Sequence, residues 1–317
     1  MKNKTKKIFA AGYFGCGNFG DELLLDIFKK RIPPEYSVTA LDARKNILKI
    51  FSDILSCDSL VFPGGGVFQD ETPLHSNLFY ASLIALSKLA GKPVFLLDQG
   101  FDIKSPFLKL FLKRVLSLAE MISVRDEASF RMLHRMHLAP FKSADAAFGL
   151  SVVKKKTRNF PPQIIAVIPR GDLHIWENLL EKCLIKWKNA EYKIAVLNAR
   201  NDMALSRKLS LITGSKITKI TSVKEMRDFM SLADMALLAP FHSIVFALLS
   251  DIPFLCVPYS AKIEKLLQAE KHLSKNIFRP ASEVFCIAPE FSANYYKLSE
   301  ESSFQIFLNL LKIKLGK

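Results

Sequence analysis

Two glycine-rich segments in the first half of the chain combine backbone freedom with acidic side chains. The first runs from Gly12 to Glu22 and the second from Pro63 to Asp70, each directly after an apolar stretch. Glycines after a strand let the backbone approach a ligand closely, and a following helix offers free N–H groups to an anion. The same pattern also suits a plain strand-to-helix turn in which Asp21 caps the helix. Both interpretations stay open for the first segment.

Three successive glycines make the second segment the stronger candidate, because they add no packing. It predicts a backbone nest for an anion or for sugar hydroxyls, with Gln69 and Asp70 as polar tips. A tight crossover into a helix is the structural alternative. A third segment, Asp98–Phe101, places Gln99 at the end of another apolar run, where a plain loop is the simpler interpretation of the segment taken alone.

Cationic and imidazole side chains follow three further apolar runs. Arg125 suits a carboxylate or phosphate through two parallel hydrogen bonds, or a surface ion pair with Asp126 or Glu127. His242 lies where a strand turns into an apolar helix, a position for a group that exchanges a proton near neutral pH or for a capping histidine. Lys262 offers a point charge to a phosphate, or is merely solvated. No spacing typical of a metal site occurs, so no metal is expected.

Short apolar runs alternate with helical patterns in both halves, which predicts parallel, doubly wound sheets. In the first half we expect strands at 8–14, 37–41, 59–62, 93–98 and 121–124, and helices at 21–30, 76–89, 106–118 and 127–136. In the second half we expect strands at 164–168, 193–197, 235–238 and 253–257, and helices at 175–188, 203–211, 223–232, 242–249, 263–270 and 304–315.

A basic stretch with two prolines at residues 154–162 separates these halves. The fold class is therefore α/β, with two Rossmann-like parallel-sheet domains at 1–155 and 160–317 facing a cleft, an arrangement described as GT-B-like. The last helix, 304–315, is expected to pack back on the first domain. In such folds ligands bind where strands end and helices begin, which is where the segments above lie.

The chain has 317 residues, of which half are hydrophobic, and a formal charge of +15 at pH 7. The charge favours anionic partners, including an anionic membrane surface. Nucleic acid is not expected, because the basic residues are spread out and not interleaved with aromatics. Five cysteines without a C-x-x-C spacing indicate a reducing compartment, and no apolar run is long enough for secretion or for a membrane span. We therefore expect a cytoplasmic protein, at most at the inner face of the membrane.

Taken in order, these segments resemble the polysaccharide pyruvyl transferase family, of the bacterial type that modifies cell-wall polymers. The family opens with Gly-Tyr-aromatic-Gly-x-x-Asn-x-Gly-Asp-Glu, and it continues with a glycine run ending in Gln-Asp, then Gly-Gln-Gly, Val-Arg-Asp-x-x-Ser, Ala-Asp-Pro-x-Phe, Arg-Leu-His-Ala and Tyr-Asp-Pro-Lys. The matching segments here are 12–22, 64–70, 98–100, 124–129, 144–148, 240–243 and 259–262. The resemblance covers nearly the whole chain.

The resemblance implies a GT-B-like transferase that moves a pyruvyl group from phosphoenolpyruvate onto a sugar of a cell-surface polysaccharide or its lipid-linked precursor, with no other cofactor. The second domain would hold the donor and the first the acceptor. It implies catalytic roles for His242 and Asp21. The implied substrate-binding residues are Tyr13, Gly15, Asn18, Gly65, Gly66, Gln69, Asp70, Gln99, Arg125 and Lys262.

The sequence departs from the family pattern at four points. Phe241 stands where the family has arginine, Ser260-Ala261 where it has Asp-Pro, Asp98 where it has glycine and Ala146 where it has proline. Two alternatives are therefore kept: a GT-B glycosyltransferase that uses a nucleotide sugar, and a non-catalytic member that binds glycan or anion. The acceptor sugar and the oligomeric state are not specified by the sequence.

Overall fold

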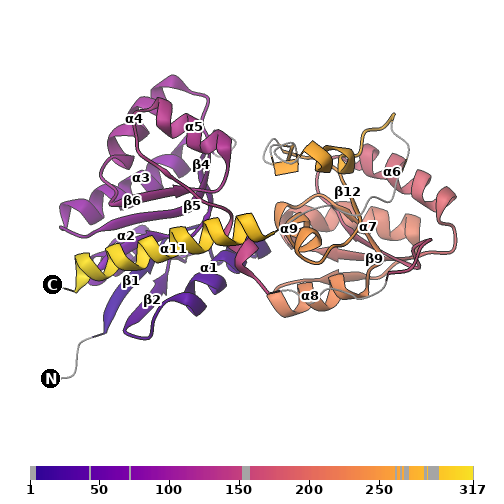
Figure 1. The fold of residues 1–317 in the computed structure, drawn as a ribbon, viewed down its shortest axis with the longest axis horizontal. Helices are drawn as coiled ribbons and strands as arrows, with labels where there is room; N and C mark the ends of the chain where they lie inside the picture. The colour runs from indigo at the N-terminus through magenta and orange to yellow at the C-terminus, as the bar shows by residue number, and fades with distance from the viewer. Residues whose placement is uncertain are drawn as a thin grey trace. The chain divides into compact units, whose positions relative to one another are not determined.

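The computed structural model describes residues 5–42, 44–70, 73–151, 158–260, 263–264, 266–267, 271–281, 284 and 293–316. The chain forms two compact units (Figure 1). The first unit comprises Met1–Cys16, Asp21–Gly149 and Asn294–Lys317, and the second comprises Gly17–Gly20 and Leu150–Ala293. The units divide close to the boundary expected at 155–160, except that the C-terminal segment belongs to the first unit. Whether each unit is an independent domain stays a prediction.

The first unit is built on a parallel sheet whose main order is β2-β1-β3-β5-β6-β7, with β4 paired to β5; in the described residues the sheet has seven strands. The strands are β1 (Lys6–Ala10), β2 (Tyr36–Ala40), β3 (Ser59–Phe62), β4 (Gly65–Gln69), β5 (Val94–Asp102), β6 (Met121–Val124) and β7 (Phe141–Lys142). The helical segments are α1 (Phe19–Arg31), α2 (Ile47–Ser56), α3 (Leu74–Leu89), α4 (Pro106–Leu116), α5 (Glu127–Arg135), η1 (Ala146–Gly149) and α11 (Asn294–Leu315).

The second unit has a parallel sheet in the order β10-β9-β8-β11-β12, five strands in its described part. The strands are β8 (Ile164–Ile168), β9 (Glu191–Val196), β10 (Ile217–Lys219), β11 (Met235–Leu238) and β12 (Phe254–Cys256). The helical segments are α6 (Leu173–Lys186), α7 (Ala199–Thr213), α8 (Val223–Leu232), α9 (Phe241–Leu249) and η2 (Lys271–Asn276).

Local sequence explains why many of these elements begin where they do. Ser222 and Glu225 form a reciprocal capping box at the start of α8. Asp126 caps α5 by accepting a hydrogen bond from the Ser129 N–H. The central strands read as short, wholly apolar runs, such as Ile165–Ile168, because helices cover both faces of a parallel sheet.

The α/β class with two parallel sheets is confirmed, and three local expectations are corrected. The strand expected at 8–14 ends at Ala10, before the glycine turn. Residues 99–101 lie inside β5 and not in a loop, and Gly65–Gln69 forms β4, because these two segments pair with each other. That pairing joins residues distant in sequence, so no local pattern reports it.

The last helix begins at Asn294, ten residues before the expected start at 304, and belongs to the first unit. The first half of this helix shows no apolar periodicity in the sequence, because its buried side chains include polar ones such as Glu300 and Ser303. Phe304 and Phe307 then pack against Phe28 of α1, with ring centroids 6.4 and 6.0 Å from that ring. The helix expected at 263–270 lies partly outside the described residues.

Candidate active site

The carboxyl edge of the second sheet provides a place for a ligand. From the central strand β8 the chain winds outward to β9 on one side and to β11 on the other. The loops that follow β8 and β11 therefore run in opposite directions from the edge of the sheet. The last hydrogen bond between them before they separate is from the Ala239 N–H to the Ile168 carbonyl, at 3.0 Å. Parallel sheets bind ligands outside the carboxyl ends of such strands.

His242 lies at this edge, in the first turn of α9, and is half-buried. Its imidazole rests directly on the backbone of Gly20: a Cβ atom added at Gly20 would lie 2.4 Å from Nδ1. The Phe241 ring stands edge-on to the imidazole, with centroids 5.3 Å apart. The sequence predicted a functional role for both the glycine turn and His242, and the structure brings the two together.

The end of the glycine turn, Gly17–Gly20, is itself part of the second unit and makes several contacts within it. The Phe19 N–H donates to the Leu197 carbonyl at 3.0 Å, and Asn18 forms an antiparallel bridge with Asn198. The Phe19 ring packs against Phe246 of α9, with centroids 6.2 Å apart. These contacts hold Gly20 where it can support the imidazole.

Arg170, two residues after β8, is a cation that the sequence analysis missed. Its guanidinium donates to both carboxylate oxygens of Asp202, at 2.9 and 2.7 Å, and to the Tyr259 hydroxyl at 3.2 Å. Burial alone would lower the pKa of Arg170, but these partners raise it overall, so the group stays charged. The side chain keeps 20% of its surface exposed. The only sequence signal was an Arg-Gly pair after an apolar strand.

In the first unit, Asp21 lies beside the second glycine segment. A Cβ atom added at Gly65 would lie 3.5 Å from Asp21 Oδ1, and Gly65 has φ +99°, which favours glycine. The Tyr80 phenol is buried, which raises its pKa, and the Asp21 charge adds to the rise. Gly66 is half-buried in β4. The two glycine segments predicted to bind substrate thus meet at Asp21.

Several residues of the first glycine segment are open to solvent. Tyr13 and Gly15 are exposed, whereas Asn18 is half-buried. The Gly15 N–H donates to Glu22 Oε1 at 2.6 Å, and its φ of +78° suits glycine. Nearby, Arg44 lowers the pKa of Asp42 to about 2.

Asp70 and Gln69 are engaged in supporting the fold. The Asp70 carboxylate accepts hydrogen bonds from the backbone N–H groups of Lys104 and Ser105, just before α4. The backbone of Gln69 exchanges two hydrogen bonds with the Asn77 side chain in α3. Among the predicted carboxylates, Asp21 is therefore the better candidate for contact with an acceptor.

Gln99 and Gly100 serve the interior of the first unit. The Gln99 side chain is fully buried, and its amide donates to the Leu97 and Phe62 carbonyls at 3.0 and 3.4 Å. Gly100 makes room for Arg125, because a Cβ there would lie 3.0 Å from the guanidinium. Both residues support β5 and its neighbours, and the predicted substrate contact of Gln99 stays untested.

Arg125 forms a buried ion pair with Asp145. Its Nη1 lies 2.7 Å from Asp145 Oδ2, and only 7% of the Arg125 side chain and 1% of the Asp145 side chain are exposed. This pair replaces the surface ion pair with Asp126 or Glu127 considered from the sequence, since Asp126 caps α5 and Glu127 pairs with Arg131 and Lys142. The segments 124–129 and 144–148 thus meet at this ion pair.

Lys262 lies outside the described residues, as does Ala261. The expected convergence of Arg125, His242 and Lys262 across a cleft stays a prediction, because the first two belong to different units and each unit is described by itself. In the described part of the chain, no group of three His, Cys, Asp or Glu side chains is placed to hold a metal ion.

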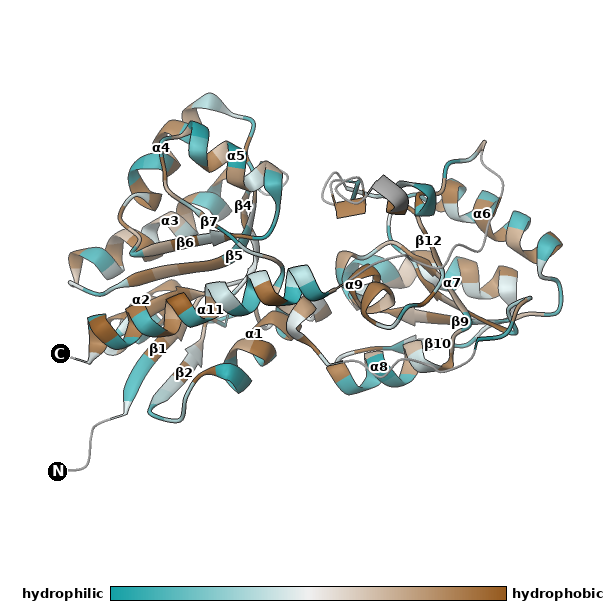
Figure 2. Ribbon diagram, in the orientation of Figure 1, coloured by the Kyte–Doolittle hydropathy of each residue, from teal (hydrophilic) through white to brown (hydrophobic). Residues whose placement is uncertain are grey.

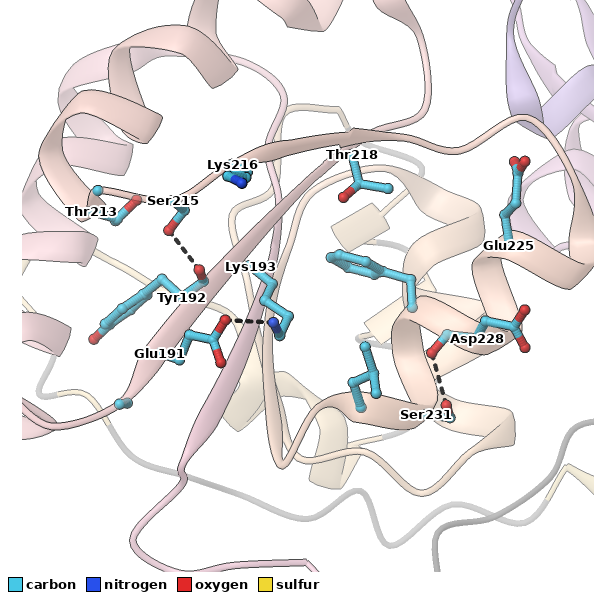
Figure 3. A pocket seen from close by; sticks show the side chains of 14 residues that line it. Glu191, Tyr192, Lys193, Thr213, Ser215, Lys216, Thr218, Glu225, Asp228 and Ser231 are labelled. Carbon is cyan, nitrogen blue, oxygen red and sulfur yellow. Dashed lines mark hydrogen bonds and ion pairs between the residues drawn. The ribbon is translucent and has the colours of Figure 1, made fainter.

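A pocket of about 920 Å³ lies at the opposite edge of the second sheet (Figure 3). It is lined by the beginnings of β9 and β10 and by the end of α8. Lys193 pairs with Glu191 at its rim, while Glu225 and Asp228 project from α8 (Figure 3). It lies away from the carboxyl ends of the strands, so we do not assign the chemistry to it.

Comparison with protein-family models identifies the family of this chain. The model of the polysaccharide pyruvyl transferase family matches residues 18–261, which is most of the chain. The chain belongs to this family. The matched region contains Asn18, Asp21, the second glycine segment, Arg125 and His242, whereas Tyr13 and Gly15 precede it and Lys262 follows it.

Solved structures similar to this pyruvyl transferase family member are distant in sequence. MurG from Acinetobacter baumannii is 12% identical over 96% of this chain and 90% of its own, with a TM-score of 0.44. A protein from Mycobacterium smegmatis is 13% identical over 98% of both chains, with a TM-score of 0.21. No curated protein sequence matches the chain significantly.

The geometry also explains two departures from the family pattern. Asp98 has φ +49°, a conformation that suits glycine and that aspartate tolerates. Ala146 begins the short helix η1, a position where proline is equally acceptable. Aspartate and alanine are both compatible with the backbone conformation observed at these positions. None of the described helices is long and apolar enough to cross a bilayer.

Proposed function

We propose that this pyruvyl transferase uses phosphoenolpyruvate to form a pyruvate ketal on a sugar of a cell-surface polysaccharide or its lipid-linked precursor, without another cofactor. Family membership supports the transfer, and the contact between His242 and Gly20 is the observation that carries the site assignment. It places a proton-exchanging group at the carboxyl edge of a parallel sheet, on a glycine from the family's first matched segment.

The reaction has a defined demand for protons. A proton adds to C3 of phosphoenolpyruvate, the methylene becomes a methyl group, and C2 becomes electrophilic. One sugar hydroxyl bonds to C2 and loses its proton. The C2–O bond to phosphate then breaks, inorganic phosphate leaves, and a second hydroxyl bonds to C2 and loses its proton. The protein must therefore supply one proton to carbon, accept two from oxygen and bind an anion.

In this proposal His242 delivers the proton to C3, and Arg170 binds the phosphate or carboxylate of the donor. Arg170 suits this role because Asp202 orients its guanidinium while 20% of the side chain stays exposed. Lys262 and Arg125 were the donor cations expected from the family. Both arginines pair with a buried carboxylate, but 20% of the Arg170 side chain is exposed against 7% of the Arg125 side chain, so Arg170 takes first place among the described residues.

Asp21 orients the acceptor and accepts a proton from its attacking hydroxyl. The supporting observation is its position beside the second glycine segment, where Asp21 Oδ1 lies 3.5 Å from the place of a Cβ atom added at Gly65. Tyr13, Gly15 and Asn18 would contribute further acceptor contacts.

The test is release of inorganic phosphate from phosphoenolpyruvate in the presence of candidate lipid-linked saccharides. His242→Ala should lower kcat about 10²- to 10⁴-fold, the usual contribution of a general acid. His174→Ala is the matched control, because His174 is exposed on α6 and pairs only with Glu177 in the described structure. Equal turnover of the two variants would remove His242 from the mechanism.

The donor is tested separately by thermal unfolding. Phosphoenolpyruvate should raise Tm, and UDP-N-acetylglucosamine should not, because only a ligand bound by the native state stabilises it. The opposite result would favour a nucleotide-sugar glycosyltransferase. Binding of phosphoenolpyruvate without phosphate release on any saccharide would indicate a non-catalytic member.

A further inference from the structure

An outer helix layer of the first unit exposes apolar side chains. Helices α2, α3 and α4 lie side by side, with α3 in the middle. Each exposes large apolar residues in its first two turns: Ile47 and Leu48 on α2, Leu74 and Leu78 on α3, and Phe107 and Leu110 on α4. Leu48 is 73% exposed and Phe107 is 76% exposed. We call these six side chains the apolar rim.

All six lie at one end of the layer. In a parallel α/β unit the helices run opposite to the strands, so their first turns lie at the carboxyl edge of the sheet. That is the edge where Asp21 and the glycine segments lie. The apolar rim therefore borders the region that we assign to the acceptor.

The helix α4 is apolar on two faces. Leu108, Leu112, Val115 and Leu116 are buried in the core, while Phe107, Leu110 and, two residues past the helix, Leu118 are exposed. Figure 2 shows brown turns on this helix beside teal ones. A helix that needed only to cover the sheet would carry polar residues on its outer face.

The charge of the layer is almost wholly positive. Its three helices contain Lys49, Lys88, Lys109, Lys113 and Arg114, against a single acid, Asp53. Asp53 is paired with Lys45 and Lys49. Within the described residues, Lys109, Lys113 and Arg114 make no ion pair. The acid that follows β4, Asp70, is bound to backbone N–H groups before α4.

A second exposed apolar patch differs from the apolar rim in the charge of its neighbouring side chains. On the second unit, Ile185 and Ile212 border a shallow pocket together with Glu177 and Glu181. Glutamates at that surface would repel an anionic bilayer. Exposed apolar groups combined with unpaired cations occur on the α2–α4 layer, and that combination is what an anionic lipid surface attracts.

We propose that the apolar rim, with the cations of α4, is the face by which this protein docks on an anionic phospholipid bilayer. The rim side chains insert among the lipid headgroups, and Lys109, Lys113 and Arg114 lie against lipid phosphates. Docking would present the acceptor side of the first unit to saccharides carried on lipid. The inference does not depend on the donor, since binding to vesicles is measured without any substrate.

The experiment is co-sedimentation of the full chain with vesicles of phosphatidylcholine alone or with phosphatidylglycerol added. The wild type should sediment with the anionic vesicles and not with the neutral ones. Phe107→Ser/Leu110→Ser should weaken binding at all salt concentrations. Lys113→Ala/Arg114→Ala should weaken it at least about tenfold at low salt, because each basic residue near such a surface contributes severalfold.

Matched controls come from α7 of the second unit. Leu211→Ser/Ile212→Ser removes two exposed apolar residues, and Arg207→Ala/Lys208→Ala removes an adjacent exposed basic pair. Neither control should alter vesicle binding. All four variants should unfold at the wild-type temperature, because the changed side chains contribute little to the core.

Three results would overturn the proposal. The first is equal sedimentation of wild type with neutral and anionic vesicles, and the second is equal binding by the α4 and α7 variants. The third is a dimer by size exclusion without lipid that Phe107→Ser/Leu110→Ser converts to a monomer while vesicle binding persists. The third result would make the rim an interface between two copies of the chain. Phosphate release in solution tests the proposed function independently of all three.

Discussion

Two arginines, each placed just after a parallel strand, have different environments. Arg125 follows β6 in the first unit, lies almost wholly buried and pairs with the buried Asp145. Arg170 follows β8 in the second unit, keeps a fifth of its surface exposed and is oriented by Asp202 and Tyr259. The first was conspicuous in the sequence and the second was not. A motif therefore marks a residue that matters, but burial distinguishes a residue that holds the fold from a candidate for contact with a ligand.

The largest expected effect is loss of stability in Arg125→Ala. Removing the guanidinium leaves the Asp145 carboxylate buried with its ion-pair partner gone, which costs roughly 3–5 kcal/mol. Urea unfolding should show the loss, and Arg125→Ala/Asp145→Ala should recover part of it. Arg170→Ala should lose less stability but raise KM for phosphoenolpyruvate. The comparison fails if Arg125→Ala unfolds like wild type and loses donor affinity.

Gly20 packs against the His242 imidazole, and Gly100 packs against the Arg125 guanidinium. In Gly20→Ala the new Cβ would lie 2.4 Å from His242 Nδ1, so the imidazole must move and kcat should fall about a hundredfold. In Gly100→Ala the Cβ would lie 3.0 Å from the Arg125 guanidinium, which should lower stability and leave kcat nearly unchanged. Phosphate release and urea unfolding of both variants distinguish the two outcomes. Loss of kcat in Gly100→Ala alone would reverse our assignment.

Two buried carboxyls near Arg125 predict a pH dependence confined to the first unit. Burial raises the pKa of Asp98 to about 6, and burial together with the Asp98 charge raises the pKa of Glu300 to about 8. Glu300 nevertheless pairs with Arg31, and burial outweighs that attraction. The two acids border one small internal cavity with Arg31.

Because both pKa values are higher in the folded state, the native protein binds protons more tightly than the unfolded chain. Stability from these groups is complete below pH 4 and declines as pH rises, through about pH 6 for Asp98 and about pH 8 for Glu300. The Asp98 share is about 3 kcal/mol, from roughly two pKa units. Asp98→Asn should flatten the decline between pH 4 and 6 in urea unfolding. An unchanged slope would show that Asp98 titrates normally.

The smallest expected effect is at Tyr259. Tyr259→Phe removes the hydroxyl that accepts from Arg170 at 3.2 Å and keeps the ring beside the guanidinium. One such hydrogen bond contributes about 1 kcal/mol, so KM for phosphoenolpyruvate should rise roughly fivefold with kcat unchanged. Tyr295→Phe, on exposed α11, is the control. No change in KM would mean that Tyr259 does not position Arg170 for the donor.

Much of the architecture was predictable because it is written in local patterns. The strands at 59–62, 121–124, 164–168 and 235–238 and the helix at 223–232 occur where expected, since wholly apolar runs and capping residues are local signals. The candidate site was predictable in part: Asp21, His242 and the glycine segments were named from motif order. Arg170 was missed, because its significance comes from Asp202 and Tyr259, which lie 32 and 89 positions away in sequence.

The sequence by itself determined the class of fold, the family and the residue types available for the chemistry. These follow from periodicity, caps and motif order, which need no knowledge of distant neighbours. Tertiary structure alone decided that Arg125 is buried against Asp145, that Gly20 supports His242 and that Asp70 binds the backbone before α4. Burial and pairing depend on residues far apart in the chain, and only folding brings those residues into contact.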